Sequence, residues 1–145
     1  MFLAAACGED PIEPPASNAV PTAHLAVIQR DAAELKRFDV GVVDTFEGRA
    51  QGLSAFSPIE DDVGLVLAFE SPARVCIFNG PVDYPIDVAY LDRDGEIRAI
   101  EQFDAREMSS RCHDGVLDVL EVRRDALDGV AVGDRVTFTP PIRTP

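Results

Sequence analysis

Apolar residues in this chain are grouped into short runs separated by turn-forming residues, and most of the runs have the spacing of β-strands. Over 38–43, Phe38, Val40 and Val42 share one face, which is typical of a half-buried strand. The run 63–69 is apolar on both faces and predicts a strand that is buried on both sides. Further strands are expected at 25–28, 73–78, 86–91, 96–100, 116–122 and 135–138.

The clearest local unit is a hairpin made of the expected strands 86–91 and 96–100. The connection Asp92-Arg93-Asp94-Gly95 ends in Asp-Gly, a pair that favours a tight turn. The segment faintly resembles the start of a calcium loop, but it lacks the third Asp or Asn before the glycine and the distal Glu. We therefore interpret it as a turn and expect no metal there.

One short helix is expected after the second strand. Asp44 can cap its first turn, and Glu47 follows three residues later, as in a capping box. Phe46, Ala50 and Leu53 would share one face, and Gly52 would end the helix. Many short strands with so few helices predict a mostly β fold, a small barrel-like or two-layered sheet domain with one or two short helices.

The chain has 145 residues, which suits a single domain, and we place that domain at 22–139. The segment 8–21 is rich in proline and acidic residues, so we expect it to be an extended linker. Residues 140–145 form a short C-terminal tail.

The segment 1–7 resembles the end of a bacterial lipoprotein signal, with an apolar residue and small residues before Cys7. A complete signal also has a basic region and a longer apolar region. We therefore expect the translated precursor to begin upstream of Met1, and Cys7 to be the lipid anchor. The alternative is a chance apolar start.

The acidic composition narrows the choice of partners. The formal net charge is −13. Because nucleic-acid binding needs clustered Lys and Arg to displace counterions, we expect no nucleic-acid partner. We likewise expect contact with a membrane only through the lipid anchor.

Two further cysteines, Cys76 and Cys112, leave two alternatives open. In an exported protein they could form a disulfide, and otherwise they would be small buried residues with free thiols. A zinc site that adds His113 is not supported, because no pair of ligands has the close spacing of such sites.

Carboxylates within expected strands are the most informative polar residues. Asp87 and Glu121 both lie on faces that carry apolar neighbours. A buried carboxylate needs a partner or hydrogen bonds, and otherwise its pKa rises. Arg49 on the short helix is a candidate partner. The arrangement predicts either a clamp that fixes the helix on the sheet or a polar cleft that binds a ligand or positions an acid.

A series of short motifs runs along 38–138. They are Arg49-x-x-Gly52-Leu53, the run 64–69, Asn79, Pro85-Ile86-Asp87, Asp94-Gly95, Leu120-Glu121 and Gly133-Asp134. In order and spacing the series resembles the family catalogued as domain of unknown function 192 (DUF192), which groups small bacterial and archaeal proteins. The resemblance implies a compact barrel-like β domain rather than an activity. This chain departs from the family pattern at Cys76-Ile77, where the family has Trp-Met, and at Gly80, where it has Thr.

These observations lead to a first hypothesis, an exported protein of the cell envelope or periplasm that is lipid-anchored through Cys7. It would be a non-enzymatic binding or accessory domain for a protein or small ligand, and we expect no cofactor. The alternative is a hydrolase-like enzyme that uses Asp87 or Glu121 with Arg49 and Asn79 in a polar cleft. The alternative requires these four side chains to converge on one open cleft.

Overall fold

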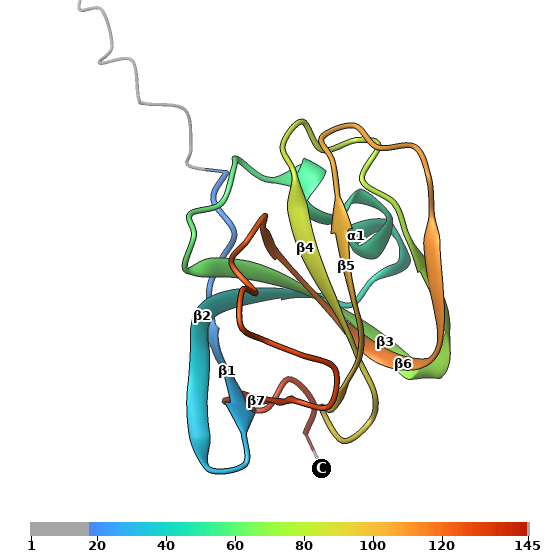
Figure 1. Cartoon of the computed structure of the whole chain (residues 1–145). Helices are drawn as coiled ribbons and strands as arrows, with labels where there is room; N and C mark the ends of the chain where they lie inside the picture. The colour runs from blue at the N-terminus through green and yellow to red at the C-terminus, as the bar shows by residue number, and fades with distance from the viewer. Residues whose placement is uncertain (1–17, 145) are drawn as a thin grey trace, which may run out of the picture.

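The computed structural model describes residues 18–144, which form one mixed sheet of seven strands with a short helical segment beside it (Figure 1). The mostly β prediction is therefore confirmed. The order across the sheet is β5-β4-β6-β3-β2-β1-β7. The strands are β1 His24–Arg30, β2 Ala33–Val43, β3 Val63–Ile77, β4 Ile86–Leu91, β5 Ile97–Phe103, β6 Arg111–Arg123 and β7 Arg135–Thr139.

The helical segment consists of α1 (Phe46–Gln51) and the adjoining 3₁₀ turn η1 (Gly52–Ala55). It lies in the connection between β2 and β3, which pair in parallel, whereas the other neighbouring strands pair antiparallel. A parallel pair cannot be joined by a tight hairpin, because the chain must first return to the end of the sheet at which the first strand begins. The crossover therefore places α1 and η1 next to the sheet.

The central strands are buried on both faces, because apolar side chains alternate between two separate clusters. We call these clusters the helix-side core and the far-side core. The helix-side core includes Leu53, Leu65, Leu67, Ile77, Val82, Val88, Tyr90, Phe103 and Val119. The far-side core includes Ile28, Phe38, Val40, Val66, Leu91, Ile97, Leu120, Val122 and Leu127.

The sheet is strongly curved, but it does not close into a barrel. Its two edge strands, β5 and β7, are not paired as a ladder. They meet through an isolated bridge between Glu96 and Arg135, beside the turn that ends at Gly95. Gly95 has φ +79°, and a Cβ there would lie 2.4 Å from the Val136 carbonyl oxygen, so this corner requires glycine.

Most strands are longer than the sequence pattern predicts, and the differences that change the picture most are in β3 and β6. The expected strands 63–69 and 73–78 are one continuous strand, β3, whose pairing with β6 shifts register between Ala68 and Val75. β6 begins at Arg111, before the expected strand 116–122, in a segment that is rich in polar residues. A strand can carry polar side chains here because this end of the β3–β6 pair lies largely at the surface.

The short helix forms where expected, but with a different cap. The N-cap is Thr45 rather than Asp44, and its hydroxyl oxygen accepts a hydrogen bond of 3.0 Å from the backbone N–H of Gly48. Leu53 is buried, whereas Phe46 is 84% exposed. The predicted face with Phe46 and Ala50 is therefore wrong, because no residue of α1 is buried and only Gly52 and Leu53 of the adjoining turn η1 enter the core.

A disulfide joins Cys76 and Cys112, which are directly opposite each other on β3 and β6. Of the two alternatives left open by the sequence, the structure thus contains the bridge. Within residues 18–144, no helix is long and apolar enough to cross a membrane.

Both ends of the described chain contact the sheet. Asn18 Nδ2 donates a hydrogen bond of 2.6 Å to the carbonyl oxygen of Ala55, and Val20 is buried. At the other end Arg143 forms a two-pronged ion pair with Asp118, with both N–O distances near 2.7–2.8 Å. Ordered contacts therefore extend beyond the predicted domain limits of 22 and 139.

Candidate functional site

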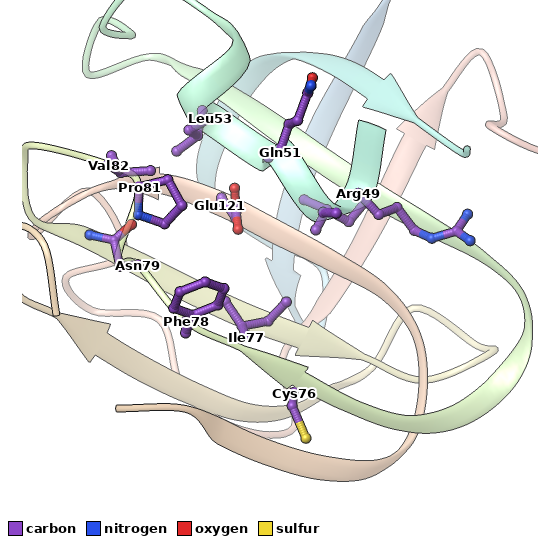
Figure 2. A pocket seen from close by; sticks show the side chains of 13 residues that line it. Arg49, Gln51, Leu53, Cys76, Ile77, Phe78, Asn79, Pro81, Val82 and Glu121 are labelled. Atoms are coloured by element: carbon purple, nitrogen blue, oxygen red, sulfur yellow. The ribbon is translucent and has the colours of Figure 1, made fainter. Parts of the chain in front are cut away.

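A small pocket lies between the helical segment and the loop that follows β3 (Figure 2). Its volume is about 100 Å³. The lining side chains come from α1 and η1, from the ends of β3 and β6, and from the loop 78–82. They are Arg49, Ala50, Gln51, Gly52, Leu53, Leu67, Cys76, Ile77, Phe78, Asn79, Pro81, Val82 and Glu121.

Glu121 is the acidic group of this pocket. It lies on β6 at the centre of the sheet, between Leu65 of β3 and Val88 of β4, and it is only 5% exposed. Removal from water raises the pKa of its carboxyl group to about 7, and the backbone N–H of Leu53 opposes this effect by stabilising the charged form. No basic side chain within residues 18–144 forms an ion pair with Glu121.

The end of the helical segment closes over this carboxyl group. Gly52 ends α1 with φ +50°, and a Cβ at this position would lie 3.3 Å from Oε2 of Glu121. A larger residue would have a strained backbone and would be packed tightly against the carboxyl group. Glycine avoids both effects. The same backbone turn brings the N–H of Leu53 to Glu121.

Asn79 contributes the second polar group, and its orientation is fixed by its own hydrogen bonds. It is 1% exposed, and its Nδ2 donates to the carbonyl oxygens of Tyr84 at 3.0 Å and Asp104 at 2.9 Å. Because both acceptors are carbonyls, the amide nitrogen must face them, and Oδ1 must point the other way. Oδ1 has no hydrogen-bond partner. In Figure 2 it is directed toward the side of the pocket where Glu121 lies.

Arg49 lines the pocket, but it does not pair with either carboxylate. Its Nη1 donates to the carbonyl oxygens of Asp44 and Ala68, at 2.5 and 3.0 Å. The guanidinium carbon lies 4.8 Å from the centre of the Phe69 ring. Figure 2 shows the guanidinium group pointing away from Glu121. Arg49 is thus a clamp between α1 and β3, made through backbone carbonyls rather than through a salt bridge.

Asp87 does not belong to the pocket, so the predicted cleft of four residues is corrected to three. Asp87 is opposite Val122 on β6, one position away from the pair formed by Val88 and Glu121. Because successive strand residues point to opposite faces, Asp87 faces the far-side core. Its oxygens accept hydrogen bonds from Nε2 of Gln102 at 3.0 Å and from the backbone N–H of Leu127 at 3.3 Å.

The remaining predicted site residues have other positions. Cys76 also lines the pocket, but its sulfur is bonded to Cys112. Cys7 lies outside the described residues. Within 18–144 no group of three or more His, Cys, Asp or Glu side chains is arranged to hold a metal ion.

Sequence reasoning missed the wall of the pocket formed by Pro81 and Val82. The prolines at 81 and 85 did indicate a loop there, but not that Val82 would be 6% exposed and packed in the helix-side core. An apolar Val in a segment bounded by prolines is the one sequence signal that could have indicated this wall.

Comparison with solved structures identifies the same fold in two other proteins. One is a crystal structure from Sinorhizobium meliloti 1021, described as "a putative transcription regulator", with a TM-score of 0.74 and 21% identity; the match covers 80% of this chain and 93% of the other. The second is a protein of unknown function from Novosphingobium aromaticivorans DSM 12444, with a TM-score of 0.72 and 17% identity; the match covers 78% and 83% of the two chains. These identities support a shared fold alone.

Among curated proteins, none matches this chain. Residues 26–138, which include the whole sheet apart from its first and last residues, match the family described as Uncharacterized ACR, DUF192. The family resemblance of the short motifs is thereby confirmed, and the chain belongs to the DUF192 family.

Proposed function

We propose that this chain is an exported, non-enzymatic binding domain of the cell envelope, and that the pocket at Glu121 receives a small polar ligand or a side chain of a partner protein. The observation that carries the proposal is that one cavity holds a buried carboxyl group without a basic partner among the described residues and a buried amide oxygen without a hydrogen-bond donor. These groups are the carboxyl group of Glu121 and Oδ1 of Asn79. Buried polar groups are normally satisfied, so a cavity lined by two such groups favours a ligand.

A binding role accounts for the pocket better than the hydrolase-like alternative. That alternative needs a second ionisable group beside Glu121 to complete an acid and base pair. Asp87 lies on the opposite face of the sheet, and the guanidinium of Arg49 is held by carbonyl oxygens. Cys76, the one thiol side chain among the lining residues, has its sulfur in a disulfide.

Export is supported by two independent features. The disulfide between Cys76 and Cys112 is a kind of bond that persists in oxidising compartments. The residues before Cys7 have the composition that precedes the lipid-accepting cysteine of bacterial lipoproteins. Location in the envelope through a lipid on Cys7 is therefore part of the proposal.

A nucleic-acid partner does not fit the charge of the chain. The Sinorhizobium structure is described in terms of transcription, but the net charge of −13 on this chain would repel phosphates. The proposal therefore includes a protein or small-molecule partner and leaves nucleic acid out.

The binding role can be tested by filling the pocket. Ala50 is exposed and lines the pocket mouth, so Ala50→Trp should block entry without disturbing the core. Small amines, alcohols, carboxylates and amides would be titrated while NMR follows the Leu53 backbone amide and the Asn79 side chain. We expect at least one class to shift these signals in a saturable way, and the block to abolish the shift. Ala33→Trp, at an exposed position on β2, is the matched control.

If no class of probe shifts the pocket signals of the unmodified chain, the binding role is wrong. The anchor has a separate test in the native host, where detergent partitioning and mass spectrometry of the purified protein would detect lipid on Cys7. A fully soluble and unmodified product would remove the anchor from the proposal but leave the pocket untouched.

A further inference from the structure

The two buried polar groups of the Glu121 pocket, the Asn79 amide oxygen and the ionised carboxyl group of Glu121, accept hydrogen bonds, and this limits what can bind there. Both N–H groups of the Asn79 amide are used by carbonyl oxygens, so this side chain offers the pocket only Oδ1. The carboxyl group of Glu121 has the backbone N–H of Leu53 as its stabilising donor. A ligand that satisfies the pocket must therefore bring donors of its own.

The walls of the pocket are apolar and the space is narrow. Leu53, Leu67, Ile77 and Val82 surround the two polar groups. The volume of about 100 Å³ is smaller than the roughly 150 Å³ of a cavity that accommodates benzene. The pocket therefore has room for one polar head group on a short aliphatic stem, and it is too small for a sugar ring or a nucleobase.

The lack of a positively charged partner for Glu121 in the described part of the chain selects among the possible head groups of a ligand. Glu121 has no basic partner in the described part of the chain, and the nearby Arg49 is engaged with carbonyl oxygens. A hydroxyl group would supply one donor and no charge. A guanidinium group has five donors, and several of them would face apolar walls without a partner. A primary ammonium group supplies a positive charge and three donors within a compact head, and its stem suits the aliphatic walls.

We propose that the pocket binds a primary alkylammonium group, either the end of a lysine side chain or a free alkylamine, with Glu121 and Asn79 Oδ1 as its two acceptors. This inference rests on the proposed binding role and adds the chemical class of the ligand. The net charge of −13 would also raise the local concentration of such cations.

Binding of this kind is linked to the ionisation of Glu121. The pKa of its carboxyl group is about 7 in the empty pocket, so the charged form that attracts an ammonium group is lost below that pH. The titratable groups that face it are Tyr84 and Tyr90, whereas the guanidinium group of Arg49 points away from it (Figure 2). Burial raises the pKa of both tyrosines above their usual value, so neither changes charge between pH 5 and 8. An alkylamine stays protonated over the same range.

The decisive probe pair is n-butylamine and its neutral isostere n-butanol, each titrated at pH 8 while the Leu53 and Asn79 signals are followed. We expect saturable shifts with butylamine and none of comparable affinity with butanol. Below pH 7 the affinity for butylamine should fall about tenfold for each pH unit, following the ionised fraction of Glu121. Glu121→Gln should weaken binding about tenfold or more and remove the pH dependence.

Glu60→Gln is the matched control, because it removes one carboxylate from an exposed loop and should leave the affinity unchanged. Equal binding of butanol and butylamine, or full affinity in Glu121→Gln, would overturn the inference. If alcohols or amides bind and amines do not, the ligand class is wrong while the binding role stands. If no probe binds, the binding role itself fails.

A second arm separates the two sources of the ammonium group. Nα-acetyl-lysine methylamide would be compared with n-butylamine under the same conditions. Tighter binding of the lysine derivative supports a protein partner, because its backbone can contact the exposed Phe78 beside the pocket. Tighter binding of butylamine supports a free amine.

Discussion

Asp87 and Glu121 occupy adjacent register positions in the centre of the sheet, yet they face opposite cores. Asp87 accepts hydrogen bonds from Gln102 and Leu127, and the Nε atom of Arg124 lies 3.8 Å from its Oδ1. Glu121 has the N–H of Leu53 and an open cavity. Both carboxyl groups have a raised pKa, in each case chiefly because of burial. The presence of partners, rather than burial or pKa, therefore distinguishes a structural carboxylate from a candidate binding group.

The largest expected effect concerns the partnered carboxylate. Asp87→Ala leaves the Leu127 N–H without its acceptor and removes the bond from Gln102. We expect a loss of about 3 kcal/mol in the free energy of unfolding, because buried groups that lose their partners are destabilising. Urea titration would measure the change. Asp83→Ala, at an exposed position, is the control and should change stability by less than about 0.5 kcal/mol. Equal stabilities would show that Asp87 is not the structural member of the pair.

The second prediction is that substitution of the unpartnered carboxylate, Glu121, stabilises the fold, whereas substitution of Asp87 destabilises it. The folded state raises the pKa of Glu121 from 4.5 to about 7, so it binds more protons than the unfolded chain between these values. Stability from this group is thus greatest below about pH 4.5 and is lost as the pH rises to about 7. Glu121→Gln, which cannot ionise, should match the unmodified chain at pH 4 and exceed it by about 3 kcal/mol at pH 8. Urea unfolding of both proteins at both pH values would test this prediction, with Glu60→Gln as the control. A Glu121→Gln variant that is less stable than the unmodified chain at pH 8 would contradict it.

A smaller effect should follow from loosening the helical segment over the pocket. Arg49→Ala removes two bonds to backbone carbonyls and the contact with Phe69. We expect a loss of about 1 kcal/mol, together with faster hydrogen exchange in α1. The pKa of Glu121 should move toward its usual value as water enters, while that of Asp87 should stay unchanged. NMR titration of both carboxyl carbons provides the comparison, and parallel shifts would refute it.

The sequence was sufficient for the fold class, the hairpin at Asp94-Gly95 and the family, because strand alternation and turn residues act locally. It was also sufficient to single out Asp87 and Glu121 as buried carboxylates. It could not place them on opposite faces, because that requires the register between β4 and β6, which depends on residues far apart in the chain. The continuous β3 was missed for a related reason, since Ser71 and Pro72 suggest a break, whereas the same strand resumes its pairing with β6 at Ala73.

The position of the disulfide has a consequence for the resistance of the domain to proteases. Cys76 and Cys112 enclose the loop 78–85, the hairpin of β4 and β5, and the loop that carries the exposed Arg106. A single cut by trypsin after Arg106 would thus leave two fragments that remain covalently joined and paired within one sheet. Such a nicked chain should migrate as one band on a gel without reductant and as two bands with it. Damage at the loops around the pocket would therefore not by itself release any part of the domain.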